Sequence, residues 1–133
     1  DSLMGDSGQD VLLGGAGRDR FVYDTRAAFT TTALGIDTIL DFQPTDDFIV
    51  LTKTTFTALK SSPGNGFSLA AEFASVGSGT GVATSAALVV YDRSTGGLFY
   101  NANGNAPGFG GGGQFATLAG APPIAASNFL VQA

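Results

Sequence analysis

The sequence predicts an all-β fold, in which the last turns of a parallel β-roll over residues 1–24 are capped by a β-sandwich-like C-terminal domain over residues 25–133. Three observations predict it. A nine-residue repeat fills the N-terminus, short apolar segments separated by turn residues follow, and the 133-residue chain combines 20 glycines with only 13% charged residues. This composition is typical of a turn-rich β protein rather than a helical one, and 44% hydrophobic residues suffice for a core.

The repeat is most complete at residues 14–22, GGAGRDRFV, which fit the pattern G-G-x-G-x-D-x-U-x at every fixed position, with U a large apolar residue. Residues 5–13, GDSGQDVLL, follow the same frame with Asp6 in place of the second glycine, and residues 1–4, DSLM, end an earlier repeat. The chain thus begins in mid-pattern, which predicts a longer parent chain. This nonapeptide is the pattern of calcium-binding parallel β-helices.

The two halves of the repeat have different tasks. Its glycines permit the positive φ angles of tight turns and leave backbone carbonyls free to point inward, and its Asp adds a carboxylate, so that the turn offers the oxygens of which Ca²⁺ takes about six to eight. The x-U-x half is a short strand with one core-facing residue. Because two repeats make one coil, an ion is expected between turns two repeats apart. Nine of the eleven acidic residues lie before residue 48, although a solubilising acidic surface would have the same composition.

Other kinds of function are disfavoured by what the sequence lacks. The chain has no His and no Cys, which disfavours a structural zinc site, thiol chemistry and a serine-protease triad, and no G-x-S-x-G motif occurs. A two-carboxylate glycosidase site remains open on composition, but the acids lie on the repeat, so we predict no enzyme. The net charge of −5 disfavours nucleic acid, and no apolar run is long enough to predict membrane insertion.

The segments after the repeats are predicted as short strands and loops, with one helix. Apolar residues predict a buried strand over residues 36–42, ended by Pro44, and a second over residues 48–51. Residues 61–66 and 77–81 read as loops, and Ser68 is placed to cap a short helix that Gly77 would end.

The C-terminal part is predicted as a hairpin and two further strands. Residues 87–91 and 98–100 form the hairpin around a turn at residues 94–97, and strands follow at residues 115–118 and 129–131. The last of these is apolar on both faces, which predicts a position inside a sheet with Phe129 and Val131 buried. Residues 132–133 are expected to protrude, and the eleven Phe side chains are interpreted as core rather than as a ligand platform.

These motifs resemble the RTX (repeats-in-toxin) proteins exported by type I secretion, and in particular the tails of serralysin-like proteins. Beyond the repeats, the resemblance rests on FVY at 21–23, GIDTILDFQPTDDFIVL at 35–51, YDRSTGGLFYNANGN at 91–105, FATLAG at 115–120 and ASNFLV at 126–131. It implies a non-catalytic, calcium-binding module secreted by a Gram-negative-type bacterium. It also implies calcium-induced folding, capping of the roll, and a C-terminal export signal read by the type I transporter.

The resemblance also implies calcium ligands. Carbonyls of Gly14 and Ala16 with the Asp19 carboxylate would complete a site with Asp1. The next site would begin with the carbonyls of Gly15 and Gly17 and the Asp19 carboxylate. Asp37 would complete this site. A third site would begin at Asp6, Gly8 and Asp10, but its partner repeat should start at Tyr23, where the pattern fails, so that other groups would have to complete it. Asp41 and Asp47 are further candidate ligands.

An alternative function is adhesion or carbohydrate binding on the cell surface. Tyr91, Tyr100 and the glycine-rich segment 101–113, interpreted as a flexible loop, would form the binding face. Asn101 and Asn103 stand where the family usually has Asp, which weakens any calcium site in that hairpin.

Overall fold

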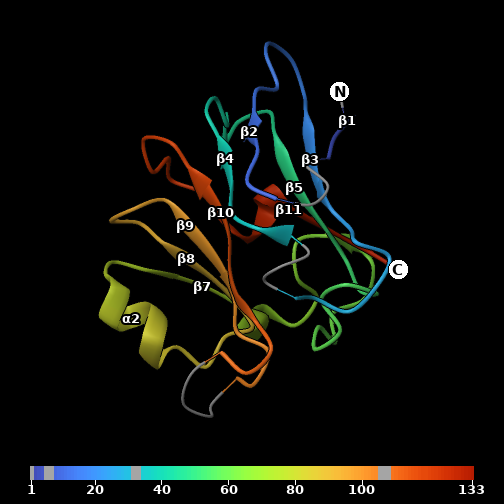
Figure 1. The fold of residues 1–133 in the computed structure, drawn as a ribbon, viewed down its shortest axis with the longest axis vertical. Coiled ribbons are helices and arrows are strands. Elements are labelled where there is room, and N and C mark those ends of the chain that lie inside the picture. The colour runs from blue at the N-terminus through green and yellow to red at the C-terminus, as the bar shows by residue number, and fades with distance from the viewer. Residues whose placement is uncertain (1, 5–7, 31–33, 105–108) are drawn as a thin grey trace.

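The chain folds into two β-sheets with little helix, which confirms the all-β prediction (Figure 1). The computed structural model describes residues 2–4, 8–30, 34–104 and 109–133. The first sheet, sheet A, contains in spatial order β1 (Ser2–Leu3), β3 (Arg20–Tyr23), β5 (Phe48–Thr52), β11 (Phe129–Gln132) and β6 (Gly64–Asn65). Sheet B contains β2 (Val11–Leu12), β4 (Asp37–Ile39), β10 (Gly113–Leu118), β9 (Gly97–Tyr100), β8 (Val89–Asp92) and β7 (Phe73–Val76).

The first five strands alternate between the two sheets. β1, β3 and β5 pair in parallel in sheet A, while β2 and β4 pair in parallel in sheet B. Leu3 lies opposite Phe21, two nonapeptides further along the chain. The register expected for one coil of two repeats is therefore present between β1 and β3.

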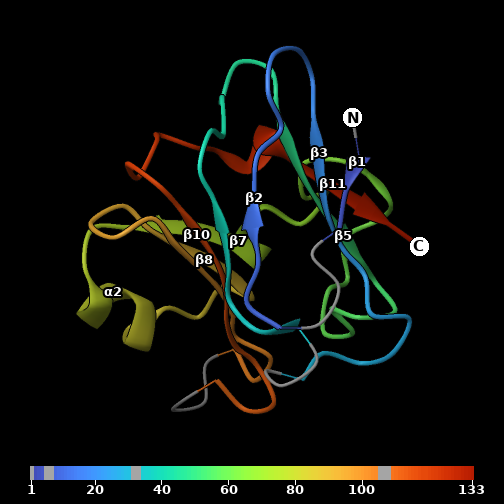
Figure 2. The ribbon, with the colours of Figure 1, turned by 45° about the horizontal axis from the view of Figure 1, so that its top comes forward.

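Two C-terminal strands extend this parallel arrangement. β10 pairs in parallel with β4 and β11 in parallel with β5 (Figure 2). Both sheets therefore join strands from before and after residue 24, and the domain boundary placed there stays a prediction. Between β5 and β10 the chain makes a long excursion that contains β6 and the β7–β8–β9 part of sheet B.

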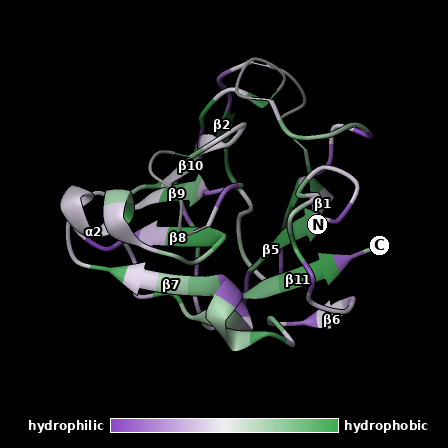
Figure 3. Cartoon of the chain, turned by 90° about the horizontal axis from the view of Figure 1, so that it is seen from below, coloured by the Kyte–Doolittle hydropathy of each residue, from purple (hydrophilic) through white to green (hydrophobic). Residues whose placement is uncertain are grey.

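The hydrophobic core lies between the two sheets and draws side chains from both. Phe21 and Ile49 of sheet A pack in one cluster with Ile39 and Leu118 of sheet B, and the apolar colouring of β5 and β11 is plain in Figure 3. Tyr23, Phe29, Phe56, Tyr100 and Phe115 form ring contacts with centroids 5.0–6.3 Å apart.

The last strand lies where the sequence predicted. β11 sits between β5 and β6, and Phe129 and Val131 are 0% and 2% exposed. Gln132 and Ala133 are exposed, although the Gln132 carbonyl still accepts a hydrogen bond from the Lys53 amide. The prediction of a buried, interior strand is confirmed.

The predicted helix after Ser68 is wrong. A single 3-10 turn, η1 (Ala70–Glu72), leads directly into strand β7, which pairs in parallel with β8. The Ser68 hydroxyl accepts the Ser62 amide instead of capping a helix, and Phe73 packs against Phe67 and Phe129. Tertiary packing of Phe73 thus outweighs a local helical preference.

The predicted loop at residues 77–81 instead runs into a short helix, α2 (Gly79–Thr84). The Ser78 hydroxyl caps it by accepting the Gly81 amide, and Val82 is buried against the cluster that contains Val90. No helix among the described residues is long and apolar enough to cross a membrane.

The predicted hairpin is confirmed, but its tyrosines are not available as a binding face. β8 and β9 pair antiparallel, with Asp92 opposite Gly97, and hydrogen bonds from Ser94 hold the pKa of the Asp92 carboxyl below its usual range. Tyr91 and Tyr100 are 0% and 1% exposed, so the surface proposed for carbohydrate binding loses both rings.

The hairpin's first asparagine is structural. Asn101 is buried, and its amide donates to the carbonyls of Ser85, Ala87 and Gly104. The Asn101 amide group therefore secures the end of the hairpin as a hydrogen-bond donor, a role that an Asp carboxylate could not fill. Part of the predicted loop 101–113 lies outside the described residues.

Candidate calcium site

Two pairs of turns connect the parallel strands, one pair at each end of the coil. The turn at residues 14–19 leads from β2 to β3, and the segment 40–47 leads from β4 to β5 beside it. At the other end, residues 8–10 lead into β2 and residues 35–37 lead into β4. Each pair brings carboxylates together, but in chemically different ways.

At the first pair, carboxylates accept backbone amides. The two Asp41 carboxylate oxygens accept the amides of Gly14 and Gly15 at 2.9 and 2.8 Å. Asp47, only 1% exposed, accepts the Asp19 amide at 3.0 Å with one oxygen and the Gln43 amide at 2.8 Å with the other. Because both oxygens of each carboxylate already hold an N–H donor, Asp41 and Asp47 act as anchors of the turn.

Asp19 is also buried at this end, at 1% exposure. Its carboxylate lies directly over Gly14, where an added Cβ would overlap the Asp19 side chain. The first glycine of the repeat is therefore required by this close approach. Gly15 and Gly17, whose φ angles are +79° and +90°, form the rest of the turn with Ala16.

At the second pair of turns, two segments of the same Gly-x-Asp sequence lie opposite each other, namely residues 8–10 and residues 35–37. The Asp37 carboxylate accepts the Asp10 amide at 3.1 Å, 27 residues away in sequence. A Cβ on Gly35, whose φ is +67°, would overlap the Gly8 carbonyl, so the two turns are in direct backbone contact. Asp37 is 1% exposed.

Among the described residues, no Lys or Arg forms an ion pair with Asp10 or Asp37. Burial raises the pKa of Asp37 to about 6, and the neighbouring Asp10 carboxylate adds to the rise, against a lowering by the Asp10 amide. The Asp10 Oδ2 atom is buried and has no hydrogen-bond partner among the residues described. Burial, with the Asp37 charge as a smaller cause, also raises the pKa of Tyr23. A buried Asp10 oxygen without a hydrogen-bond partner, close to the Asp37 carboxylate, is the kind of ligand that a hard cation such as Ca²⁺ binds.

The pair alone does not complete a calcium shell. Among the described ranges, no three acidic side chains gather as one group that could hold a metal. Asp10 and Asp37 supply two carboxylates, so backbone carbonyls such as that of Gly8 would have to supply further oxygens. Asp1 and Asp6, which the sequence predicted as ligands, lie outside the described residues.

The pairing of the predicted ligands differs from the one that the resemblance implies. Asp37 lies opposite Asp10 rather than beside Asp19, and Asp47 takes the place opposite Asp19. Opposite Gly8 and Asp10 lies Gly35-Ile36-Asp37 rather than the segment from Tyr23. The signal was present in the sequence, because Gly8-Gln9-Asp10 and Gly35-Ile36-Asp37 match, but the spacing of 27 residues is three nonapeptides instead of two.

The fold is an all-β domain in which two Gly-x-Asp turns stack on each other. The family described as Peptidase M10 serralysin C terminal matches residues 1–97, and the chain belongs to this family. The match is to the C-terminal, non-catalytic domain of serralysin-type proteases, a module of secreted RTX proteins. No curated protein and no solved structure matches the chain.

Replacing Asp47 by Ala should destabilise the domain with or without calcium. The substitution removes the acceptor for two backbone amides, those of Asp19 and Gln43, which costs about 2–4 kcal/mol of unfolding free energy. Asp46→Ala makes the same charge change at an exposed neighbour and should stay within about 0.5 kcal/mol of the wild type. Urea unfolding measures both. A loss that appears only when calcium is present would contradict the anchoring role of Asp47.

Proposed function

We propose that this chain is a calcium-binding C-terminal module of a secreted RTX protein, and that calcium binds between the turns of Asp10 and Asp37 to close the end of a β-roll. The observation that carries the proposal is the buried, unpartnered Asp10 oxygen beside the Asp37 carboxylate. Ca²⁺ would supply a positive charge beside these two carboxylates. Gly8 and Gly35 would hold the two turns close enough for both to contribute oxygens.

The residues of the nine-residue repeat would bind calcium at further sites toward the N-terminus. In this proposal Gly14, Ala16 and Asp19 face the turn that contains Asp1, and Asp6 joins Gly8 and Asp10. Gly15 and Gly17 shape the last turn, which Asp41 and Asp47 close through their amide contacts. The proposal thus assigns one calcium ion to the Asp10–Asp37 turns and a second to the turn of Asp19, whose Oδ2 atom is also buried, while Asp41 and Asp47 anchor that turn through backbone amides.

Calcium would couple folding to export. Inside a cell calcium is scarce, and repulsion between Asp10 and Asp37 opposes the folded state. Outside, calcium that binds only the folded form stabilises it by about 2.7 kcal/mol per site at a hundredfold excess over Kd. An unfolded chain would leave the C-terminal strand readable by a type I transporter, which we propose as the partner during secretion.

Deleting residues 126–133 should therefore abolish export, whereas deleting residues 132–133 should preserve it. The shorter deletion leaves Phe129 and Val131 in place. The measurement is the amount of full-length protein in the medium of cells that co-express a type I transporter. Cytosolic levels of each variant serve as the control for expression. Normal secretion of the chain without residues 126–133 would refute the export role.

A further inference from the structure

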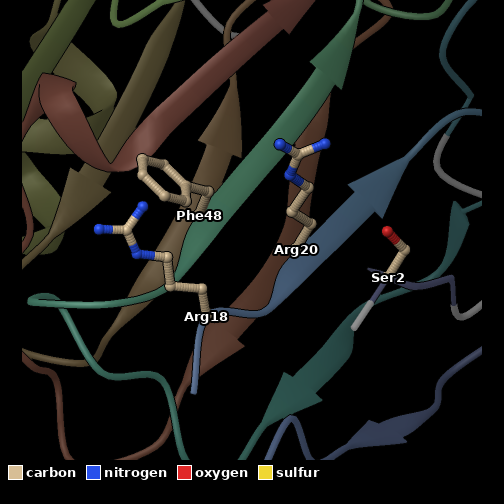
Figure 4. A pocket seen from close by; sticks show the side chains of 4 residues that line it. All are labelled: Ser2, Arg18, Arg20 and Phe48. Carbon is tan, nitrogen blue, oxygen red and sulfur yellow. The ribbon is translucent and has the colours of Figure 1, made fainter.

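A pocket of about 300 Å³ opens on sheet A and is lined by Ser2, Arg18, Arg20 and Phe48 (Figure 4). Ser2, Arg20 and Phe48 occupy the same register position on three neighbouring parallel strands, β1, β3 and β5. They therefore lie on one face of the sheet, and the residues that follow them in sequence face the core on the other. Arg18 reaches the pocket from the turn before β3.

The pocket concentrates positive charge in an acidic protein. Two of the six Lys and Arg residues line it, while the net charge of the whole chain is −5. Arg20 is exposed, and no carboxylate within the described part of the chain pairs with its guanidinium. The neighbouring acid, Asp19, is buried on the Gly14 side of the turn.

An aromatic ring completes the pocket. Phe48 is half-buried rather than part of the core, which corrects the interpretation of every Phe as core. In the view of Figure 4 its ring lies between the guanidinium groups of Arg18 and Arg20. A Phe ring offers a flat apolar surface for a ligand ring, and the Ser2 hydroxyl can donate or accept a hydrogen bond.

We propose that this pocket binds an organic oxyanion, namely a carboxylate or phosphate carried on a six-membered ring. Guanidinium groups bind carboxylate and phosphate through paired charge-assisted hydrogen bonds, and the carrier ring packs on Phe48. A volume of about 300 Å³ is at the small end of ligand sites and suits one such ring. The proposal is independent of calcium binding, because none of the four residues that line the pocket belongs to the Asp10–Asp37 turns.

The test is a titration of the whole chain, in calcium-containing buffer, followed by amide chemical shifts. The probes are benzoate and glucuronate, with benzyl alcohol and glucose as their uncharged counterparts and inorganic phosphate as an oxyanion without a ring. At least one of the two ring carboxylates should bind saturably, with shifts at Arg20 and Phe48, and neither uncharged counterpart should. Benzoate binding alone would indicate an aryl ligand, and glucuronate binding alone an acidic sugar.

Variants assign the binding to the pocket. Arg20→Gln should weaken binding about tenfold or more, because a charge-assisted hydrogen bond is lost, whereas Arg26→Gln makes the same charge change at an exposed residue outside the pocket. Phe48→Leu should weaken binding of the ring carboxylate but not of phosphate. Arg18→Gln replaces Arg20→Gln if the latter loses the wild-type spectrum. Equal affinities in the pocket variants and in Arg26→Gln, or equal binding of the uncharged counterparts, would overturn the proposal.

Discussion

Deletion of residues 126–133 is expected to abolish the cooperative unfolding transition of the domain. The deletion removes β11, which pairs with β5 on one side and β6 on the other. It also removes Phe129, which contacts Phe67 and Phe73 with ring centroids 5.3 and 5.0 Å apart. Truncating one buried Phe costs about 3–5 kcal/mol, against a total stability of about 5–15 kcal/mol for a domain, so loss of the whole strand exceeds what the fold can tolerate.

Thermal denaturation followed by circular dichroism measures this effect. Deleting only residues 132–133 should preserve the transition, because the principal loss is the hydrogen bond from the Lys53 amide to the Gln132 carbonyl, worth about 1 kcal/mol. Phe129→Ala and the half-buried Leu130→Ala form a matched pair on opposite faces of β11, and the first should be the more damaging. A wild-type melt without residues 126–133 would contradict the interior position of β11.

Removal of calcium is the second large expected effect. If one site binds calcium at a hundredfold excess over Kd, chelation removes about 2.7 kcal/mol, which lowers the melting temperature of a domain this size by about 10 °C. Asp10→Asn should give the same lowering in calcium, because the Asp10 Oδ2 atom is buried, lacks a hydrogen-bond partner and lies beside the Asp37 carboxylate.

The pKa of Asp37, raised to about 6, gives this effect a pH signature. A carboxyl whose pKa is higher in the folded state binds its proton more tightly there. Its contribution to stability is therefore complete below the ordinary Asp pKa of about 4 and is lost as the pH rises through about 6. In chelator, the Asp37 carboxyl should make the melting temperature higher at pH 5 than at pH 7.5. The Asp37→Asn variant should show a smaller difference in melting temperature between the two pH values. In calcium the order reverses, because protons compete with the ion.

The sequence predicted the features that depend on local spacing. The nine-residue period placed Leu3 opposite Phe21, and the apolar residues on both faces of 129–131 placed β11 inside sheet A. The turn residues after Asp92 marked the hairpin. In each case the chemistry of a few neighbouring residues determines the structure, so a single sequence suffices.

Features that depend on distant contacts were missed. The resemblance to the family pairs Asp37 with Asp19, whereas in the structure the Asp37 carboxylate lies opposite Asp10, 27 residues away in sequence. The helix expected after Ser68 was displaced by the packing of Phe73 on Phe129. Likewise, nothing near Arg20 in the sequence indicates that Phe48 lies beside it in the next strand.

Calcium binding itself is tested most directly by calorimetric titration of Ca²⁺ into the chelator-treated and desalted domain at pH 7.5. The account predicts saturable binding by the wild type, loss of at least one ion in Asp37→Asn, and no change in Asp46→Asn, which removes an exposed acid near the anchored turn. A domain that binds no calcium, or an Asp37→Asn variant that binds as many ions as tightly as the wild type, would contradict it.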